Sequence, residues 1–155
     1  MAKGYAQCYS IDYDKTTTPT VRLESLRAIS HIAATLGWDI QHFDIKTTFL
    51  HGILPDDETM FMEQPPGFKV EGKEDWVLRL LKSIFGMKQA SRVWNKTFDK
   101  VMKELGFERL DCKWCVYRRQ TPSGIIIFLL HVNDILSTAS TQEENERFKV
   151  QLRKH

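Results

Sequence analysis

Long hydrophobic runs are absent from this chain of 155 residues, and cysteine is scarce. No apolar stretch approaches the roughly 18 residues that a membrane-spanning helix needs, so no such helix is expected. The segment from Met1 to Gln7 has no apolar region of the kind found in a secretory signal. Three cysteines, an odd number in a chain without a visible signal, indicate reduced thiols in a reducing compartment.

Neither sign of charge dominates the chain. Its 22 lysines and arginines against 20 acidic residues give a net charge of +2. This excess neither requires nor excludes a nucleic-acid partner, because local basic patches matter more than the total. A hydrophobic fraction of 42% and a charged fraction of 27% are ordinary for a globular protein. With no repeat or linker, the length favours one domain with its own core.

Three stretches carry the signals of helices. They are residues 18–36, residues 91–105 and a last helix that begins at Thr141. For the first, Thr18 is the expected N-cap and Pro19 the first helical residue, and a glycine ends it. For the last, Thr141 and Glu144 have the spacing of a capping box. The middle helix has the clearest apolar stripe.

Short runs of branched and aromatic residues predict the strands. These runs are residues 38–43, 59–63, 77–81, 116–119, 124–131 and 135–139. A Thr-Pro-Ser-Gly turn joins the fourth run to the fifth, which indicates a hairpin, and residues 46–51 predict a single helical turn. Helices mixed with mainly antiparallel strands indicate an α+β fold.

Two of the predicted strands end on an acid. Asp44 closes what is expected to be a buried strand, and Asp134 lies 90 residues later at the tip of a predicted hairpin. If the two strand ends converge, their carboxylates can hold the pair of divalent cations that phosphoryl transfer to a 3′-hydroxyl uses. Each aspartate alone is explained as well by turn chemistry, so the prediction depends on the pair.

Six motifs in order along the chain resemble one known family, the reverse transcriptase domain of copia-type LTR retrotransposons. The motifs are AKGYAQ (2–7), IDYDKTTTPTVR (11–22), FDIKTTFLHG (43–52), MEQPPGF (62–68), SIFGMKQASRVW (83–94) and HVND (131–134). The resemblance implies a polymerase-type palm, an antiparallel sheet backed by helices, with partial fingers, over residues 1–155. It places the thumb and RNase H outside these residues.

The resemblance also implies a function. It is two-metal nucleotidyl transfer by an RNA-directed DNA polymerase that uses two Mg²⁺ ions, a primer–template of RNA or DNA, and dNTPs. The remainder of a polyprotein is a further expected partner, and a membrane is not. The expected location is intracellular, in a cytoplasmic particle or the nucleus, and not secreted.

Site residues follow from the matched motifs. Asp44 and Asp134 are the implied catalytic acids and metal ligands, and Phe49 is the implied steric gate against a 2′-hydroxyl. The implied nucleotide-binding residues are Phe49, Phe85, Gly86, Lys88, Gln89 and Arg92. Without the resemblance, Phe49 is equally well explained as a core aromatic residue. For Lys88 and Arg92, the favoured interpretation is then the solvated start of a helix.

Asn133 occupies the position where the family has the first acid of its hairpin motif. An amide offers an oxygen but no negative charge, so we expect activity to fall by orders of magnitude. Two alternatives therefore stay open: a non-catalytic module that binds nucleic acid or protein, and a pseudogene-derived chain without a selected role.

Other groups of chemically active residues have plainer explanations. Cys112 and Cys115 form a lone CxxC without the second pair that a zinc site needs, and the family pattern makes Cys115 a core residue. Asp56, Asp57 and Glu58 are expected to form an acidic loop tip. Lys96, Lys100 and Lys103 share a helix face that is expected to be solvated, although it could also contact phosphates.

Overall fold

The computed structural model describes residues 2–56, 58–111 and 113–154, apart from the side chain of Trp114. Its helices are α1 (Leu23–Leu36), α2 (Ala90–Glu104) and α3 (Gln142–Leu152), with 3-10 turns at Gly4–Ala6 and Thr48–His51. Its strands are β1 (Asp39–Asp44), β2 (Met60–Glu63), β3 (Val77–Leu80), β4 (Glu108–Leu110), β5 (Lys113–Thr121), β6 (Gly124–His131) and β7 (Asp134–Ala139). The predicted α+β class is confirmed.

The chain divides into two compact units. The first unit comprises Met1–Thr18 and Thr47–Thr97, and the second comprises Pro19–Lys46 and Phe98–His155. Helix α2 therefore contributes its first half to one unit and its second half to the other. No helix among the described residues combines the length and apolar character needed to cross a membrane.

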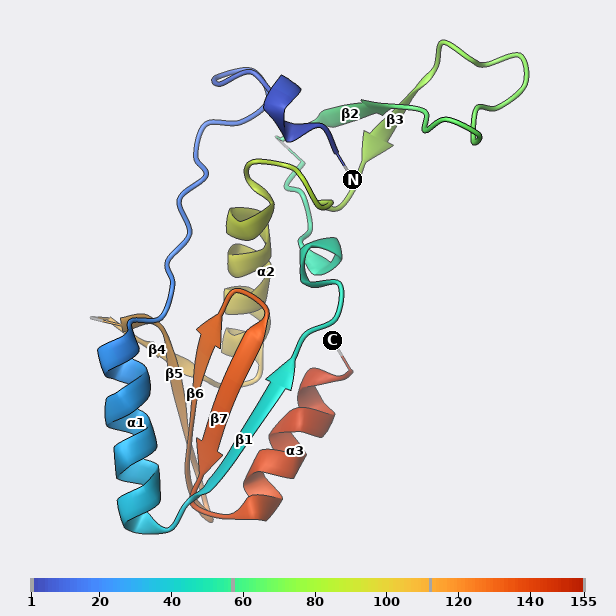
Figure 1. The fold of residues 1–155 in the computed structure, drawn as a ribbon. Coiled ribbons are helices and arrows are strands. Elements are labelled where there is room, and N and C mark those ends of the chain that lie inside the picture. The colour runs from blue at the N-terminus through green and yellow to red at the C-terminus, as the bar shows by residue number, and fades with distance from the viewer. Residues whose placement is uncertain (1, 57, 112, 155) are drawn as a thin grey trace. The chain divides into compact units, whose positions relative to one another are not determined.

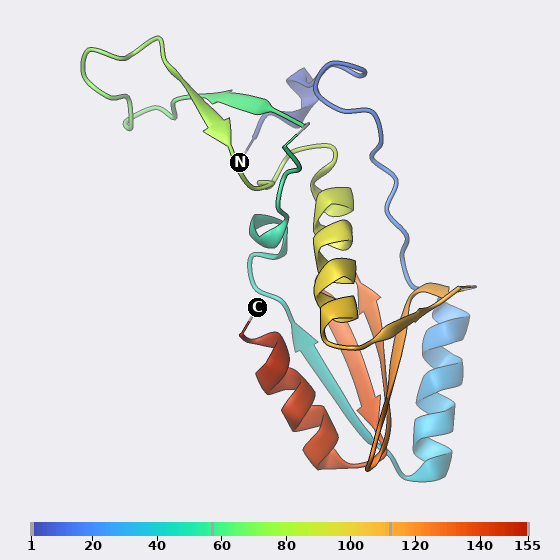
Figure 2. The same ribbon diagram turned by 180° about the vertical axis from the view of Figure 1, so that it is seen from behind.

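The second unit is built on a five-stranded sheet with the order β1-β7-β6-β5-β4, in which every pairing is antiparallel. Figures 1 and 2 show α1 and α3 flanking this sheet, and both helices contact β1. Phe128 of β6 lies at the centre of an aromatic core, stacked on Tyr117 at 4.8 Å and on Phe148 of α3 at 5.1 Å. Phe98 adds an edge-to-face contact to the same ring. These large apolar surfaces stabilise the sheet against its helices.

The first unit has a smaller core. Leu54, Met60, Met87, Ala90 and Val93 are buried together, with Phe49 and Leu80 packed against them. Strands β2 and β3 form a separate two-stranded sheet. Figure 2 shows the loop between these two strands extending away from them. This hairpin has little covering of its own, because Phe61, Phe68 and Trp76 are all exposed.

Three local predictions are wrong. Thr18 is not a helix cap and Pro19 is not helical, because α1 begins at Leu23 after an extended N-cap residue, Arg22. The β-branched residues before it favour extended backbone. Strand β1 is not buried: it is an edge strand whose alternate side chains are exposed. Strand β4 was missed because it has only three residues and is held by pairing with β5.

Most other elements lie within a few residues of their predicted positions. Gly37 ends α1 in the left-handed conformation, with φ of 65°, where glycine carries no Cβ penalty. Thr141 caps α3 by accepting a hydrogen bond from the Glu144 backbone N–H at 3.4 Å. The hairpin of β5 and β6 turns at the predicted site, although β5 begins three residues earlier than expected.

Candidate metal centre and nucleotide-binding residues

Asp44 and Asp134 lie directly opposite each other where β1 pairs with β7. Figure 1 shows the tip of the β6–β7 hairpin beside the end of β1. Directly opposed residues of an antiparallel pair project to one face, with Cβ atoms about 4.5–5.5 Å apart. The predicted meeting of the two strand ends is therefore confirmed. Both carboxylates reach solvent, since Asp44 is exposed and the Asp134 side chain is 46% exposed.

Asn133 bonds directly to one of these acids. Its side-chain Nδ2 donates to Asp44 Oδ1 at 2.6 Å. Its backbone carbonyl accepts from the Ile45 backbone N–H at 2.9 Å. The residue before it, Val132, has a positive φ of 60°, a strained conformation for a β-branched side chain. The Asn133 side chain therefore binds Asp44 from the hairpin tip, where the backbone of the preceding residue is strained.

His42 contacts the second acid. Its Nε2 lies 3.1 Å from Asp134 Oδ1, and both side chains are accessible to water. This contact was missed at the sequence level. The signal was present, because His42 stands two positions before Asp44 in a strand and so shares its face.

These residues suit a hard divalent cation only in part. Asp44 and Asp134 supply carboxylate oxygens, the ligand type that Mg²⁺ prefers. Asn133 adds no charge, and its amide nitrogen faces Asp44. Across residues 2–56, 58–111 and 113–154, no cluster of three or more His, Cys, Asp or Glu side chains is arranged to hold a metal. The strand ends thus bring together two carboxylates and one amide, which is one acid fewer than the resemblance implies.

In the first unit, Phe49 and Phe85 form an edge-to-face pair with ring centroids 5.0 Å apart. Phe49 packs against the buried cluster of this unit, whereas Phe85 is 45% exposed. The core interpretation of Phe49 thus has structural support, and its role as a steric gate stays a prediction. Phe85 is thus the more accessible of the two rings.

Gly86 is held against the N-terminal segment of the chain. It has a positive φ of 95°, and a Cβ placed on Gly4 would lie 1.8 Å from the Gly86 carbonyl oxygen. The Ala2 backbone N–H also donates to the Phe85 carbonyl at 2.7 Å. The segment at 2–4 therefore fixes the backbone of the predicted nucleotide-binding stretch.

Gln89 and Lys88 are tied to residues 7–13. Gln89 is only 2% exposed, accepts a hydrogen bond from Gln7 Nε2 at 3.0 Å and donates to the Asp12 carbonyl at 2.9 Å. Lys88 is exposed, with Nζ 3.3 Å from the Gln7 carbonyl and 3.2 Å from the Tyr13 hydroxyl. Gln89 thus connects the start of α2 to residues 7–12 through buried hydrogen bonds, whereas the charged group of Lys88 lies at the surface.

A cavity of about 460 Å³ lies next to Gln89. Arg92, Gln89 and Lys96 line it from α2 and the segment before it. The opposite wall comes from residues 10–15, including Lys15, together with 58–60. Arg92 also donates from Nη1 to the Thr17 carbonyl at 3.2 Å. Two of the predicted nucleotide-binding residues therefore meet at one cavity, whose acidic lining residues Asp12, Asp14 and Glu58 sequence reasoning did not assign to it.

Of the remaining candidates, Lys96 and Glu58 line the cavity of the first unit. Cys115 is buried, as predicted, and burial raises the pKa of its thiol from 9.0 to about 11. Cys112 and Asp57 lie outside the described residues, so the CxxC and the acidic tip are each described only in part. Lys96, Lys100 and Lys103 are exposed, which agrees with a solvated helix face.

Opposed acids at adjacent strand ends of an antiparallel sheet are a feature of nucleic-acid polymerases. The chain belongs to the reverse transcriptase (RNA-dependent DNA polymerase) family, whose model matches residues 1–155. It is 42% identical over 88% of its length to the retrovirus-related Pol polyprotein from transposon TNT 1-94 of Nicotiana tabacum. It is 35% identical over 90% of its length to the corresponding polyprotein from transposon RE2 of Arabidopsis thaliana.

The chain covers 10% of each of these two relatives. It is also 34% identical over 72% of its length to the putative transposon Ty5-1 protein YCL074W of Saccharomyces cerevisiae, of which it covers 35%. No solved structure matches. The resemblance that the motifs indicated is thus confirmed at the level of the family.

Proposed function

We propose that the strand-end acids form the nucleotidyl-transfer site of an RNA-directed DNA polymerase that acts on a primer–template and dNTPs. The second unit corresponds to a palm and the first unit to fingers. The observation that carries this proposal is the register of β1 and β7, which sets Asp44 opposite Asp134. Family membership and the predicted roles of the same residues support it.

Asp44 and Asp134 would hold Mg²⁺ through their carboxylate oxygens. The bound cation would supply charge neutralisation at the triphosphate and a lower pKa for the attacking hydroxyl. The protein's own contribution is a rigid pair of ligands, because the β1–β7 pairing fixes their separation. His42 competes for one Asp134 oxygen, which further weakens cation binding.

Asn133 makes this site weak. Its N–H donates to Asp44 Oδ1 and so occupies an oxygen that a cation would use. It also removes one negative charge where the family has an acid. Activity is therefore expected orders of magnitude below that of a three-acid site, because metal assistance stabilises the transition state by several kcal/mol.

The first unit would bind the phosphates of the template or the incoming nucleotide. Arg92, Lys96 and Lys15 line its 460 Å³ cavity, and Lys88 is exposed nearby in the chain. Phosphates bind such groups through charge, so binding should weaken steeply with salt. The acids in the same cavity limit the net attraction and favour a small number of direct contacts.

The test is a calorimetric titration with Mg²⁺ and Mn²⁺ of the wild type, Asn133→Asp and Asp44→Ala. We expect weak binding by the wild type, at least about tenfold tighter binding by Asn133→Asp because an added carboxylate favours a hard cation, and none by Asp44→Ala. His42→Ala is a matched change at the same face and should tighten binding slightly. Equal binding by wild type and Asp44→Ala would contradict the proposal.

Primer extension on an RNA template gives the second readout. We expect incorporation by Asn133→Asp to exceed that of the wild type. The hydrogen bond between Asn133 and Asp44 also favours a second candidate, a module that binds nucleic acid without turnover. Salt-dependent binding of primer–template with no incorporation by either protein would select this candidate over the polymerase.

A further inference from the structure

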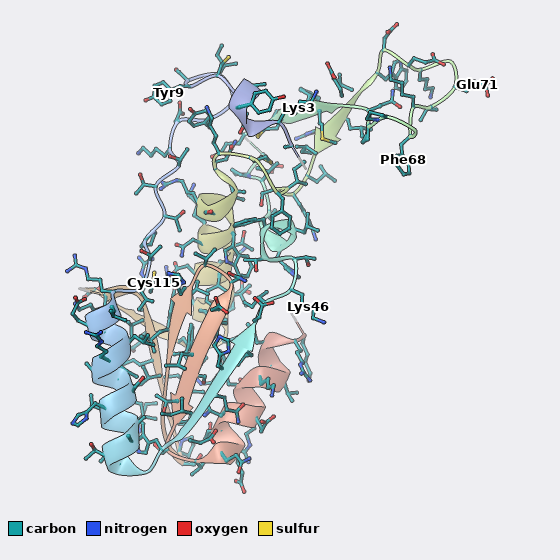
Figure 3. The ribbon with its side chains drawn as sticks, viewed as in Figure 1. Lys3, Tyr9, Lys46, Phe68, Glu71 and Cys115 are labelled. Carbon is teal, nitrogen blue, oxygen red and sulfur yellow. The ribbon has the colours of Figure 1, made fainter. Side chains whose placement is uncertain are left out.

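Exposed apolar side chains gather on the β2–β3 hairpin of the first unit and on the loop that joins its two strands. Phe61 and Leu78 on the strands, and Phe68, Val70 and Trp76 on the loop, are each at least 43% exposed. Figure 3 shows the Phe68 side chain pointing outward from this loop. Large apolar side chains that gather on one exposed element mark an interaction surface.

A buried glutamine fixes the shape of this loop. Gln64 is 6% exposed, and its Nε2 donates to the carbonyls of Lys73 at 2.6 Å and Trp76 at 2.9 Å. Its Oε1 accepts from the Val70 backbone N–H at 2.8 Å. The Lys73 Nζ atom also lies 4.2 Å from the centre of the Trp76 ring. A surface that is ordered in this way loses little conformational entropy when it binds a partner.

Strand β3 has an edge that can accept a further strand. Across residues 2–56, 58–111 and 113–154, β2 is its only strand partner, and the isolated bridge between Ile53 and Lys82 lies beyond its end. Val77, Leu78 and Arg79 of β3 are all exposed, which agrees with an uncovered edge. An open edge presents backbone N–H and C=O groups that can pair with another strand, and a two-stranded sheet is only marginally stable without one.

The charges of the hairpin favour a protein partner over a nucleic acid. Residues 61–81 carry four acids and three bases, which are Glu63, Glu71, Glu74 and Asp75 against Lys69, Lys73 and Arg79. A net charge of −1 does not attract phosphates, so a nucleic-acid strand is not the expected occupant. The only charged residue of β2 is Glu63, whereas β3 and the turn before it carry both signs. Opposite charges at one edge allow β3 to pair with a copy of itself.

We propose that β3 pairs antiparallel with β3 of a second copy of this chain across a two-fold axis. Arg79 lies in β3 and Asp75 in the turn that leads into it, and neither forms an ion pair with a described residue. An axis through Val77 sets Asp75 of each copy opposite Arg79 of the other. Opposite charges on directly opposed residues stabilise a strand pair, and the symmetry repeats this pair at both ends of the contact.

The same register also matches the apolar side chains. Trp76 and Leu78 are two positions apart and so project to one face of the strand. Within the hairpin, Met62 of β2 is already opposite Leu78. In the dimer, Leu78 is also opposite Trp76 of the second copy, so three apolar side chains lie side by side across the joined, four-stranded sheet. The contact is small, so we expect a transient dimer and not a permanent one.

The first test measures the mass of the full chain by analytical ultracentrifugation over a wide range of protein concentration. We expect the wild type to dimerise as concentration rises. Asp75→Arg and Arg79→Glu each set like charges against each other at both ends of the contact, so each variant alone should dimerise at least about tenfold more weakly. Glu71→Lys is the matched charge reversal at an exposed site outside the register and should change dimerisation less than about twofold. A wild type that stays monomeric, or equal losses in all three variants, would overturn the proposal.

An equimolar mixture of Asp75→Arg and Arg79→Glu tests the register itself. A mixed pair again sets opposite charges against each other at both ends, so the mixture should dimerise about as well as the wild type although neither variant does so alone. Both substitutions are at exposed sites, and equal melting temperatures of the variants and the wild type confirm that each still folds. A mixture that stays as monomeric as its two components would overturn the pairing of Asp75 with Arg79.

Hydrogen exchange of the wild type locates the contact. Exchange in β3 should slow as protein concentration rises, whereas exchange in β6, a strand of the other unit, should not change. A dimer that leaves exchange in β3 unchanged forms elsewhere and would overturn the proposal. The outcome is independent of the polymerase proposal, because Asp44→Ala removes a predicted metal ligand and should dimerise like the wild type.

Discussion

A single amide decides how the strand-end acids behave. Two carboxylates that face each other repel, and a third acid at the position of Asn133 would raise that repulsion. Asn133 instead donates to Asp44 and brings no charge, so the hairpin tip can close without a metal. The bond is exposed to solvent, and its contribution to stability is therefore about 1 kcal/mol or less. Under the proposed function, the amide that stabilises the metal-free site would also weaken its chemistry.

Cys115 gives a prediction about pH. Burial raises the pKa of its thiol from 9.0 to about 11, so the folded protein keeps a proton that the unfolded chain loses. Stability is unaffected below about pH 9 and falls between pH 9 and 11, by up to about 3 kcal/mol. Urea unfolding at pH 8, 9, 10 and 11 measures this slope.

Cys115→Ala is the variant that isolates this effect, and its pH slope should be shallower than that of the wild type. Tyr117 contributes in the same direction, because burial and the nearby Asp99 carboxylate also raise its pKa. Tyr117→Phe therefore serves as a parallel control with its own reduced slope. Identical slopes in the wild type and Cys115→Ala would show that the thiol does not titrate in this range.

At the scale of elements, α3 is joined to β1 and β7 by one buried side chain. Asn145 Nδ2 donates to Asp39 Oδ2 at 2.7 Å and to the Asp39 carbonyl at 3.0 Å. Its Oδ1 accepts from the Ser137 hydroxyl at 2.5 Å. Because Asn145 and Ser137 are almost wholly buried, no water replaces these bonds if the amide is removed.

We expect Asn145→Ala to lower the free energy of unfolding by about 2–4 kcal/mol, since it leaves the buried Ser137 hydroxyl without its acceptor and removes the amide donor from Asp39. Glu146→Ala is the matched control: it is the next residue of α3, and its exposed bond to Gln41 of β1, at 3.0 Å, should contribute less than about 0.5 kcal/mol. Chemical denaturation measures both. Similar losses in the two variants would contradict the role of the buried amide.

The elements also show which local signals can be predicted from sequence. Thr141, Gly37 and the hairpin turn each depend on chemistry within a few residues, and each was predicted. The start of α1 was not, because a Thr-Pro pair fits either a helix cap or an extended entry. The apolar stripe of this helix did not help to locate its start, because the stripe does not match the buried face: Leu23, Ile32 and Leu36 are exposed.

At the scale of the molecule, sequence reasoning predicted that Asp44 and Asp134 meet, because the motifs at 43–52 and 131–134 resemble those of a family in which the two strand ends converge. It could not predict which side chains contact these acids. The bonds from Asn133 and His42 depend on the exact register of three strands, which no local pattern encodes. The division into two units likewise arises from contacts between distant segments.

Local stability should differ widely between the two units. Strand β6 is the central strand of five and packs four buried side chains, Ile126 and Phe128–Leu130, into its core. The β2–β3 pair is two-stranded, and Phe61, Val77 and Leu78 on it are exposed. An isolated pair of strands is marginally stable, and amides open according to the contacts that hold them.

We therefore expect native-state hydrogen exchange, followed by mass spectrometry, to be slower in β6 than in β2 and β3 by more than about tenfold. Ile126→Ala should lower the protection of the whole five-stranded sheet, because the exchange of a central strand reports global unfolding. Phe61→Ala, at an exposed position of β2, should leave β6 unchanged. Equal exchange in the two sheets would mean that the small hairpin is covered by surfaces beyond the contacts described, and the division into units of unequal stability would then be wrong.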